Sequence, residues 1–148
     1  MANLVYNKKA LFDYEVLEKY EAGIELLGFE VKSIRDNRGS LEGAYVIMRG
    51  QEAYLVGATI PPYQQGNTPA DYDPQRTRRL LLQKEEIRKL SSKGDMKSLT
   101  LIPISMYNKG RVIKVEVALS RGKKKFDKRE SIKKRETGRE IRREMKGH

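Results

Sequence analysis

The strongest constraint on how this chain folds is the composition of its last 28 residues, 121–148. They hold 13 Lys or Arg and five Asp or Glu, which is a net charge of +8 out of +11 for the whole chain. Ordering a backbone costs roughly 1–2 kcal/mol per residue. The sizeable apolar side chains in this segment are Phe126, Ile132, Ile141 and Met145, too few to offset that cost. We therefore predict a basic tail that stays disordered until it binds a polyanion.

Residues 1–120 are nearly balanced in charge, with 18 basic and 15 acidic side chains, and contain nearly all the aliphatic residues. A chain of this length forms one hydrophobic core. We predict a folded domain at 1–120 and a tail at 121–148. The sequence has no apolar run near the roughly 20 residues that cross a bilayer, no signal-peptide pattern at residues 1–10 and no Cys. A cytoplasmic protein is expected.

The residue types of common catalytic and metal sites are scarce. The single imidazole is His148, the last residue, and Cys is absent, so His-dependent catalysis and zinc binding are not expected. The glycines form no phosphate-binding loop. We therefore expect neither an enzyme, a metal site nor a cofactor.

Alternation of apolar and polar residues predicts antiparallel strands. One long strand is expected from Phe12 to about Leu26, with a break at Gly23. Two runs on either side of Gly50-Gln51 predict a hairpin, and two longer runs from Leu99 to Leu119 predict another around Asn108-Lys109-Gly110. Pro103 lies inside the later hairpin, and because proline cannot donate to a strand ladder we expect a bulge or an edge there.

Two short helices are predicted between the strands. Residues 29–35 form one, ending before a positive-φ Gly39, and residues 83–92 form another, closed by Gly94. A Pro-rich irregular stretch, 59–73, separates the first hairpin from the second helix. About six antiparallel strands with two or three capping helices favour a mainly β, closed or nearly closed barrel, and a two-layer sandwich is the alternative.

Three groups of charged residues in the domain are candidates for binding RNA. Asn7-Lys8-Lys9 precedes the first long strand. Glu30 lies near a helix start, where a carboxylate could accept hydrogen bonds from nucleobase amino groups. Arg76, Arg78 and Arg79 are expected on the rim of the barrel, where guanidinium groups bind phosphates. Tyr63 and Tyr72 are available for stacking in the preceding loop.

The tail contains a candidate docking element of its own. Phe126 is embedded among lysines and could stack on a base while its neighbours bind the backbone. Beyond residue 130 the composition favours a marginal helix, in which Ile141 and Met145 share a face.

Several segments, in this order and spacing, closely resemble the SsrA-binding protein family, also called small protein B. The segments are Asn7-Lys8-Lys9-Ala10, Asp13-Tyr14, Tyr-Glu-Ala-Gly-Ile (20–24), Glu-Val-Lys-Ser (30–33), Ala-Tyr-Leu-Val-Gly-Ala (53–58), Asp-Pro-x-Arg-x-Arg-Arg-Leu-Leu-Leu (73–82), Gly-Arg-Val-x-Lys-Val-Glu-Val-Ala-Leu (110–119) and Gly-Lys-Lys-x-Phe-Asp-Lys-Arg (122–129).

This resemblance implies a specific function. Members of the family are bacterial cytosolic proteins with an oligonucleotide-binding-like barrel that bind the tRNA-like domain of transfer-messenger RNA. They deliver it to ribosomes stalled on truncated messages, where the tail occupies the decoding centre and the empty message channel. The resemblance implies no enzymatic activity. It also implies elongation factor Tu, together with aminoacylated transfer-messenger RNA, as a further partner. A monomer without membrane contact is expected.

The resemblance places the RNA-recognition acid at Glu30, with supporting contacts at Leu81 and Gln83. Gln83 stands where the family often has His or Asn, and Phe126 where it often has His or Tyr, so stacking is kept at 126 and side-chain hydrogen bonding is lost. The expected RNA-binding set is Asn7, Lys8, Lys9, Glu30, Lys32, Ser33, Arg35, Arg76, Arg78, Arg79, Leu81, Gln83 and Lys84. The expected ribosome-binding set is Arg121, Lys123, Lys124, Phe126, Asp127, Lys128, Arg129, Ile141 and Met145.

Two other functions fit the composition: a ribosomal protein with a basic extension, and a charge-rich RNA-processing enzyme. Two outcomes are expected under the first interpretation. Glu30→Ala should weaken RNA binding without unfolding the barrel, and truncation after Ser120 should leave RNA binding largely intact while abolishing tagging of stalled chains.

Overall fold

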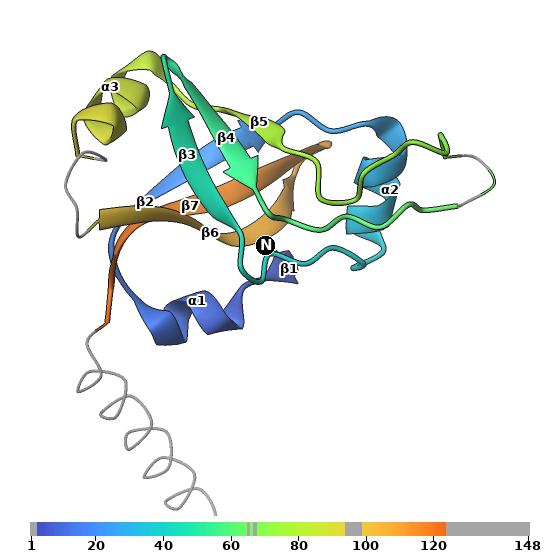
Figure 1. Ribbon diagram of the computed structural model, residues 1–148, viewed down its shortest axis with the longest axis horizontal. Coiled ribbons are helices and arrows are strands. Elements are labelled where there is room, and N and C mark those ends of the chain that lie inside the picture. Colours follow the sequence, from blue (N-terminus) through green and yellow to red (C-terminus); the bar gives the residue numbers. More distant parts are fainter. Residues whose placement is uncertain (1–2, 65, 67, 94–98, 124–148) are drawn as a thin grey trace, which may run out of the picture.

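The computed structural model describes residues 3–64, 66, 68–93 and 99–123, and shows a mainly β protein with three short helices (Figure 1). The strands are β1 (Asn3–Tyr6), β2 (Tyr14–Ile24), β3 (Tyr45–Arg49), β4 (Glu52–Val56), β5 (Arg78–Leu81), β6 (Leu99–Lys109) and β7 (Val112–Gly122). The helices are α1 (Lys8–Asp13), α2 (Gly28–Arg35) and α3 (Lys84–Lys93). No helix within the described ranges is long and apolar enough to cross a membrane.

The strand pairings close on themselves, as the sequence predicts for a barrel. Strand β2 pairs with β7 and β5, β5 with β4, β4 with β3, β3 with β6, and β6 with β7, all antiparallel, while β1 adds to β6. The β3–β6 closure is a single residue pair, Val46 and Leu101. Closure leaves one interior, and the main core fills it with buried aliphatic side chains such as Leu41, Leu55 and Val117.

Both predicted hairpins are present. Gly50 and Gly110 lie in their turns with φ angles of +64°, a backbone conformation that residues with a side chain rarely adopt. The register of β6 against β7 shifts between Pro103 and Ser105, which confirms the expected bulge. One face of the first hairpin, with Val46, Ala53 and Leu55, packs against the main core.

The N-terminal third differs from the prediction. Residues 8–13 form α1, not the start of a strand, because the Asn7 side chain accepts a hydrogen bond from the Ala10 amide (3.3 Å) and caps the helix. Ala10 and Leu11 of α1 then pack on a second small core around Ile102 and Ile104. Gly23 does not break β2, because it is paired on both sides, with Leu81 and with Lys114.

The two predicted helices are confirmed within a residue or two. Helix α2 ends at a positive φ, as expected, but Asn37 (φ +59°) supplies it and not Gly39. Helix α3 presents Leu90 to the core. Its predicted C-terminal glycine, Gly94, lies outside the described residues.

Strand β7 continues past the predicted domain boundary at Ser120. Arg121 pairs with Glu15 and Gly122 with Tyr14 across the β2–β7 ladder. The Lys123 amide then donates to the Asp13 carbonyl (2.9 Å). These pairings extend the folded part to Lys123, and the predicted disorder of the tail from 124 onwards concerns residues outside the described part.

Candidate nucleic-acid interface

A cluster of charged side chains joins α2, β5 and the irregular loop that precedes β5. The Glu30 carboxylate lies at its centre and is fully buried. It accepts hydrogen bonds from the Leu27 amide (2.8 Å), the Tyr72 hydroxyl (2.9 Å) and the Arg76 and Arg78 guanidinium groups. Two segments that are far apart in the sequence, the start of α2 and residues 72–78, are therefore fixed at one carboxylate.

Arg78 is the buried partner of Glu30, with no exposed surface. Its Nε and Nη2 donate to one Glu30 oxygen at 2.9 and 2.7 Å. Its remaining donors reach the carbonyl oxygens of Ala58 (3.0 Å), Arg76 (2.9 Å) and Pro74 (3.0 Å). A buried charge is tolerated when it is paired and its hydrogen bonds are satisfied, and Arg78 meets both conditions.

The environment shifts the titration of the cluster. Burial raises the pKa of the Glu30 carboxyl, but hydrogen bonds from Arg76, the Leu27 amide and Arg78 outweigh it, and the pKa lies below its usual value of 4.5. Burial and the bond to Glu30 raise the pKa of Tyr72 to about 12, so its hydroxyl remains a donor. Glu30 is therefore a carboxylate near neutral pH, and no proton transfer is expected of it.

We expect acid to weaken the fold through Glu30. Because its folded pKa is depressed, its contribution to stability is complete above about pH 4.5 and is lost as pH falls through the folded value. Urea melts at pH 7, 5, 4 and 3 measure the decline. Glu30→Gln has no carboxylate at this position, so its free energy of unfolding should decline less steeply over the same pH range. An equally steep decline would assign the acid sensitivity to other groups.

Four side chains of the predicted RNA-binding set are buried in the structure, and their contacts with RNA stay predictions. Glu30 and Arg78 bind each other in the interior. The Asn7 side chain is used by the protein itself: its Nδ2 donates to the Leu41 (3.2 Å) and Pro103 (3.0 Å) carbonyls. Ser33 lies on the buried face of α2. None of the four side chains is exposed on the protein surface.

The remaining predicted RNA contacts in the barrel are on the surface, and their RNA contacts stay predictions. Arg76 is partly exposed and the others are exposed. They are Lys8, Lys9, Lys32, Arg35, Arg76, Arg79, Leu81, Gln83 and Lys84. Figure 1 shows that the helices α1, α2 and α3, which carry several of these residues, lie at separate parts of the barrel. Arg121 pairs with Glu15 (2.8 Å), Lys123 follows β7, and the other predicted tail contacts lie outside the described residues.

The region around the C-terminal end of α2 carries several exposed cations. Lys32 and Arg35 lie on its outer face, and Arg35 donates to the Arg111 carbonyl (2.8 Å) in the β6–β7 turn. Arg38 follows the helix, pairs with Asp36 (2.7 Å) and lies 5.4 Å from the centre of the Tyr63 ring. Cations held this way suit a phosphate backbone.

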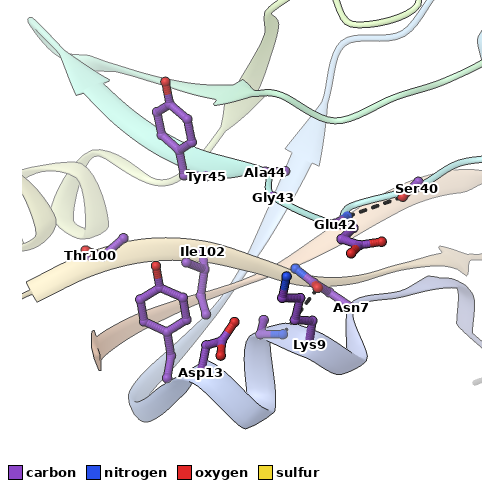
Figure 2. Close-up of a pocket in the computed structure, with 12 residues that line it drawn as sticks. Asn7, Lys9, Asp13, Ser40, Glu42, Gly43, Ala44, Tyr45, Thr100 and Ile102 are labelled. Carbon is purple, nitrogen blue, oxygen red and sulfur yellow. Dashed lines mark hydrogen bonds between the residues drawn. The ribbon is translucent and has the colours of Figure 1, made fainter. Parts of the chain in front are cut away.

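The surroundings of α1 are of mixed charge. A cavity of about 670 Å³ lies between α1 and the segment that leads into β3. Figure 2 shows Lys9, Asp13 and Glu42 around it. Two carboxylates beside one lysine are a poor match for a polyanion. Within the described ranges no three His, Cys, Asp or Glu side chains group closely enough to hold a metal ion.

The two loop tyrosines predicted to stack are occupied by the protein. The Tyr72 ring packs edge-on against Phe29 (4.7 Å between centres), and its single hydroxyl hydrogen is shared between Glu30 (2.9 Å) and the Ile60 carbonyl (2.7 Å). The Arg38 guanidinium covers one face of Tyr63. The RNA-binding set predicted from the sequence does not include the exposed cations Arg38 and Arg111. It also omits the exposed apolar side chains of Leu27 and Tyr45.

Two patterns could have indicated the buried pair. Arg78 alternates with Leu80 at the spacing that puts both on one face of a strand, and Leu80 is in the core. Glu30 precedes the buried Ile34 by four residues, so both lie on one face of α2. A charge placed in phase with core residues on both elements indicates a buried ion pair.

Comparison with known proteins agrees with this architecture over nearly the whole chain. The family described as "SmpB protein" matches residues 4–147. The SsrA-binding protein of Malacoplasma penetrans (strain HF-2) is 49% identical over 146 residues, covering 99% of each chain. The SsrA-binding protein of Cupriavidus necator (strain ATCC 17699) is 50% identical over 142 residues, covering 95% of this chain and 94% of its relative.

A solved structure is similar in three dimensions as well. The chain described as "tmRNA-SmpB: a journey to the center of the bacterial ribosome" superposes with a TM-score of 0.68 at 41% identity. The match covers 86% of this chain and 92% of that one. A family match over almost every residue, with this level of identity, leaves one conclusion: the chain belongs to the SmpB protein family.

Proposed function

We propose that this protein is the RNA-binding adaptor of trans-translation. It binds the tRNA-like domain of transfer-messenger RNA, also called SsrA RNA, and delivers it to stalled ribosomes in the cytoplasm, without catalysing a reaction itself. The tail occupies the decoding centre and the empty message channel, which leads to tagging of the nascent chain. Aminoacylated RNA in complex with elongation factor Tu is the expected incoming form.

One observation carries the proposal: about 50% identity, over 95% or more of the chain, to proteins named SsrA-binding protein. The solved relative described with tmRNA and the ribosome supports the same pair of partners. The chemistry of the surface is compatible, since the described cations around α2 can bind phosphates and the sequence adds a strongly basic tail.

Gel-shift titration with SsrA RNA tests the proposal directly. We expect saturable binding whose affinity falls steeply with salt, because cations that bind phosphates release counterions. A tRNA-sized RNA hairpin that lacks the tRNA-like domain is the control and should bind more weakly at the same salt. Equal affinity for both RNAs would reduce the interaction to general electrostatics.

Charge reversal locates the binding face. We expect Lys32→Glu with Arg35→Glu, on α2, to weaken binding of SsrA RNA by about tenfold or more, since two phosphate contacts are replaced by repulsion. The matched control is Lys8→Glu with Lys9→Glu on α1, the same change in charge beside the Asp13 and Glu42 carboxylates, and should have the smaller effect. The opposite order of effects would move the RNA to the α1 side.

A ribosomal protein remains the second candidate, favoured by the basic tail alone. Sedimentation with stalled and elongating ribosomes separates the two. The adaptor should associate with stalled particles, whereas stoichiometric retention on all particles at high salt would favour the ribosomal protein.

A further inference from the structure

Of the three charged residues in the Glu30 cluster, Arg76 alone reaches the surface. Its side chain is 31% exposed, whereas those of Glu30 and Arg78 are fully buried. Its Nε donates to one Glu30 oxygen (3.1 Å) and its Nη2 to the other, so the guanidinium is held as a fork on the carboxylate. Nη1 takes no part in this fork.

The charges of the cluster do not cancel. Glu30 and Arg78 neutralise each other inside the protein, so the Arg76 charge remains as a net +1 at the surface. The fork fixes the plane of the guanidinium, which an exposed arginine would otherwise sample freely. A cation whose orientation is set in advance loses less freedom when it binds a phosphate.

The anchor is rigid for reasons visible around it. Tyr72 donates to Glu30 and also accepts from Arg78 (3.1 Å), and its ring packs on Phe29. The Leu27 amide holds the remaining Glu30 oxygen at the start of α2. Helix, loop and strand therefore hold Glu30, and through it Arg76, in one place.

We propose that Glu30 is a positioning residue: it does not touch RNA, and it holds the Arg76 guanidinium so that its outward edge binds a phosphate of SsrA RNA. The proposal rests on the function proposed above and assigns the RNA contact of this cluster to Arg76. Lys32 and Arg35 are exposed on the same helix as Glu30.

Three roles for Glu30 predict different results for Glu30→Gln. This change removes a negative charge, so simple electrostatics predicts tighter binding to RNA. A carboxylate that binds a base directly predicts weaker binding that is independent of Arg76. A positioning role predicts weaker binding that disappears once Arg76 is gone, because the two residues act as one unit.

The experiment is a double-mutant cycle of Glu30→Gln and Arg76→Ala, read as affinity for SsrA RNA at several salt concentrations, with circular dichroism melting to show that each variant is folded. We expect each single variant to weaken binding by about tenfold or more. Arg76→Ala should also lower the slope of log affinity against log salt by about 0.7–0.9, the share of one phosphate contact. The double variant should bind as Arg76→Ala does.

Arg79→Ala is the matched control. Arg79 lies on the same segment and is exposed, but its ion pairs are with the surface residues Glu25 (3.6 Å) and Glu52 (3.0 Å). Its effect should combine with that of Glu30→Gln by simple multiplication. Tighter or unchanged binding by Glu30→Gln, or a double variant with Arg76→Ala as weak as the product of its singles, would overturn the proposal.

If Glu30→Gln does not fold, Arg76→Lys decides the matter, since it keeps the charge and leaves the buried Glu30–Arg78 pair intact. Lysine cannot form the fork, so we expect it to lose most of the affinity that alanine loses. Binding equal to the unmodified protein would overturn the positioning role. Failure of the unmodified protein to bind SsrA RNA would instead refute the proposed function.

Discussion

Glu30→Ala is expected to lower the free energy of unfolding by about 3–5 kcal/mol, because it leaves the fully buried Arg78 without its counter-charge. Domains of this size are stable by only about 5–15 kcal/mol. The sequence alone led us to expect that this variant weakens RNA binding without unfolding the barrel, and burial of the carboxylate adds the expectation of a less stable barrel. Urea titration followed by circular dichroism measures the change.

The control is Glu25→Ala, which removes a carboxylate that is 55% exposed and pairs with Arg79 on the surface. Exposed pairs contribute about 0–1 kcal/mol, so a small change is expected. A comparable loss in both variants would show that Arg78 finds another way to satisfy its charge.

A double replacement, Glu30→Leu with Arg78→Met, sharpens the test. Replacing both partners of a buried ion pair by apolar side chains is often close to neutral. We expect the double variant to recover much of the stability lost in Glu30→Ala, although Arg76 and Tyr72 then lose their acceptor. A double variant less stable than Glu30→Ala would mean that the network, and not the uncompensated charge, dominates.

Truncation after Lys123 is expected to abolish tagging of stalled chains while leaving affinity for SsrA RNA largely intact. Residues 124–148 contain 11 Lys or Arg and five Asp or Glu, and in the proposed function they bind the ribosome and not the RNA held by the barrel. A reconstituted stalled-ribosome tagging reaction and gel-shift titration, at one stated salt concentration, measure the two effects.

The structure favours truncation after Lys123, three residues later than the domain boundary at Ser120 that the sequence predicted. Truncation after Ser120 would remove the pairs that Arg121 and Gly122 make with β2 and the bond from the Lys123 amide, and would weaken the barrel itself. A full-length variant whose tail has the same composition in scrambled order is the second control. Tagging by that variant would show that charge alone is sufficient, and loss of RNA affinity on truncation would make the tail the main RNA-binding element.

Local sequence patterns predicted the elements in which buried and exposed residues follow the regular spacing of a strand or a helix. The hairpins at Gly50 and Gly110, the bulge at Pro103 and the helices α2 and α3 all follow from alternation, helical spacing and turn residues. Helix α1 was missed because Phe12 and Tyr14 happen to alternate in phase with the strand that follows, while the Asn7 cap decided the local fold.

The sequence by itself determined that this is a mainly β member of its family with a basic C-terminal segment, because strand alternation, net charge and ordered motifs are properties of neighbouring residues. Which of its charges face solvent was decided by the tertiary structure alone. Glu30 lies 46 residues before Arg76 and 48 before Arg78, and the two arginines are only two residues apart, so their spacing alone does not say which of them is buried. Closure of the barrel brings them together, and low dielectric then makes the buried pair an anchor and leaves Arg76 to face outward.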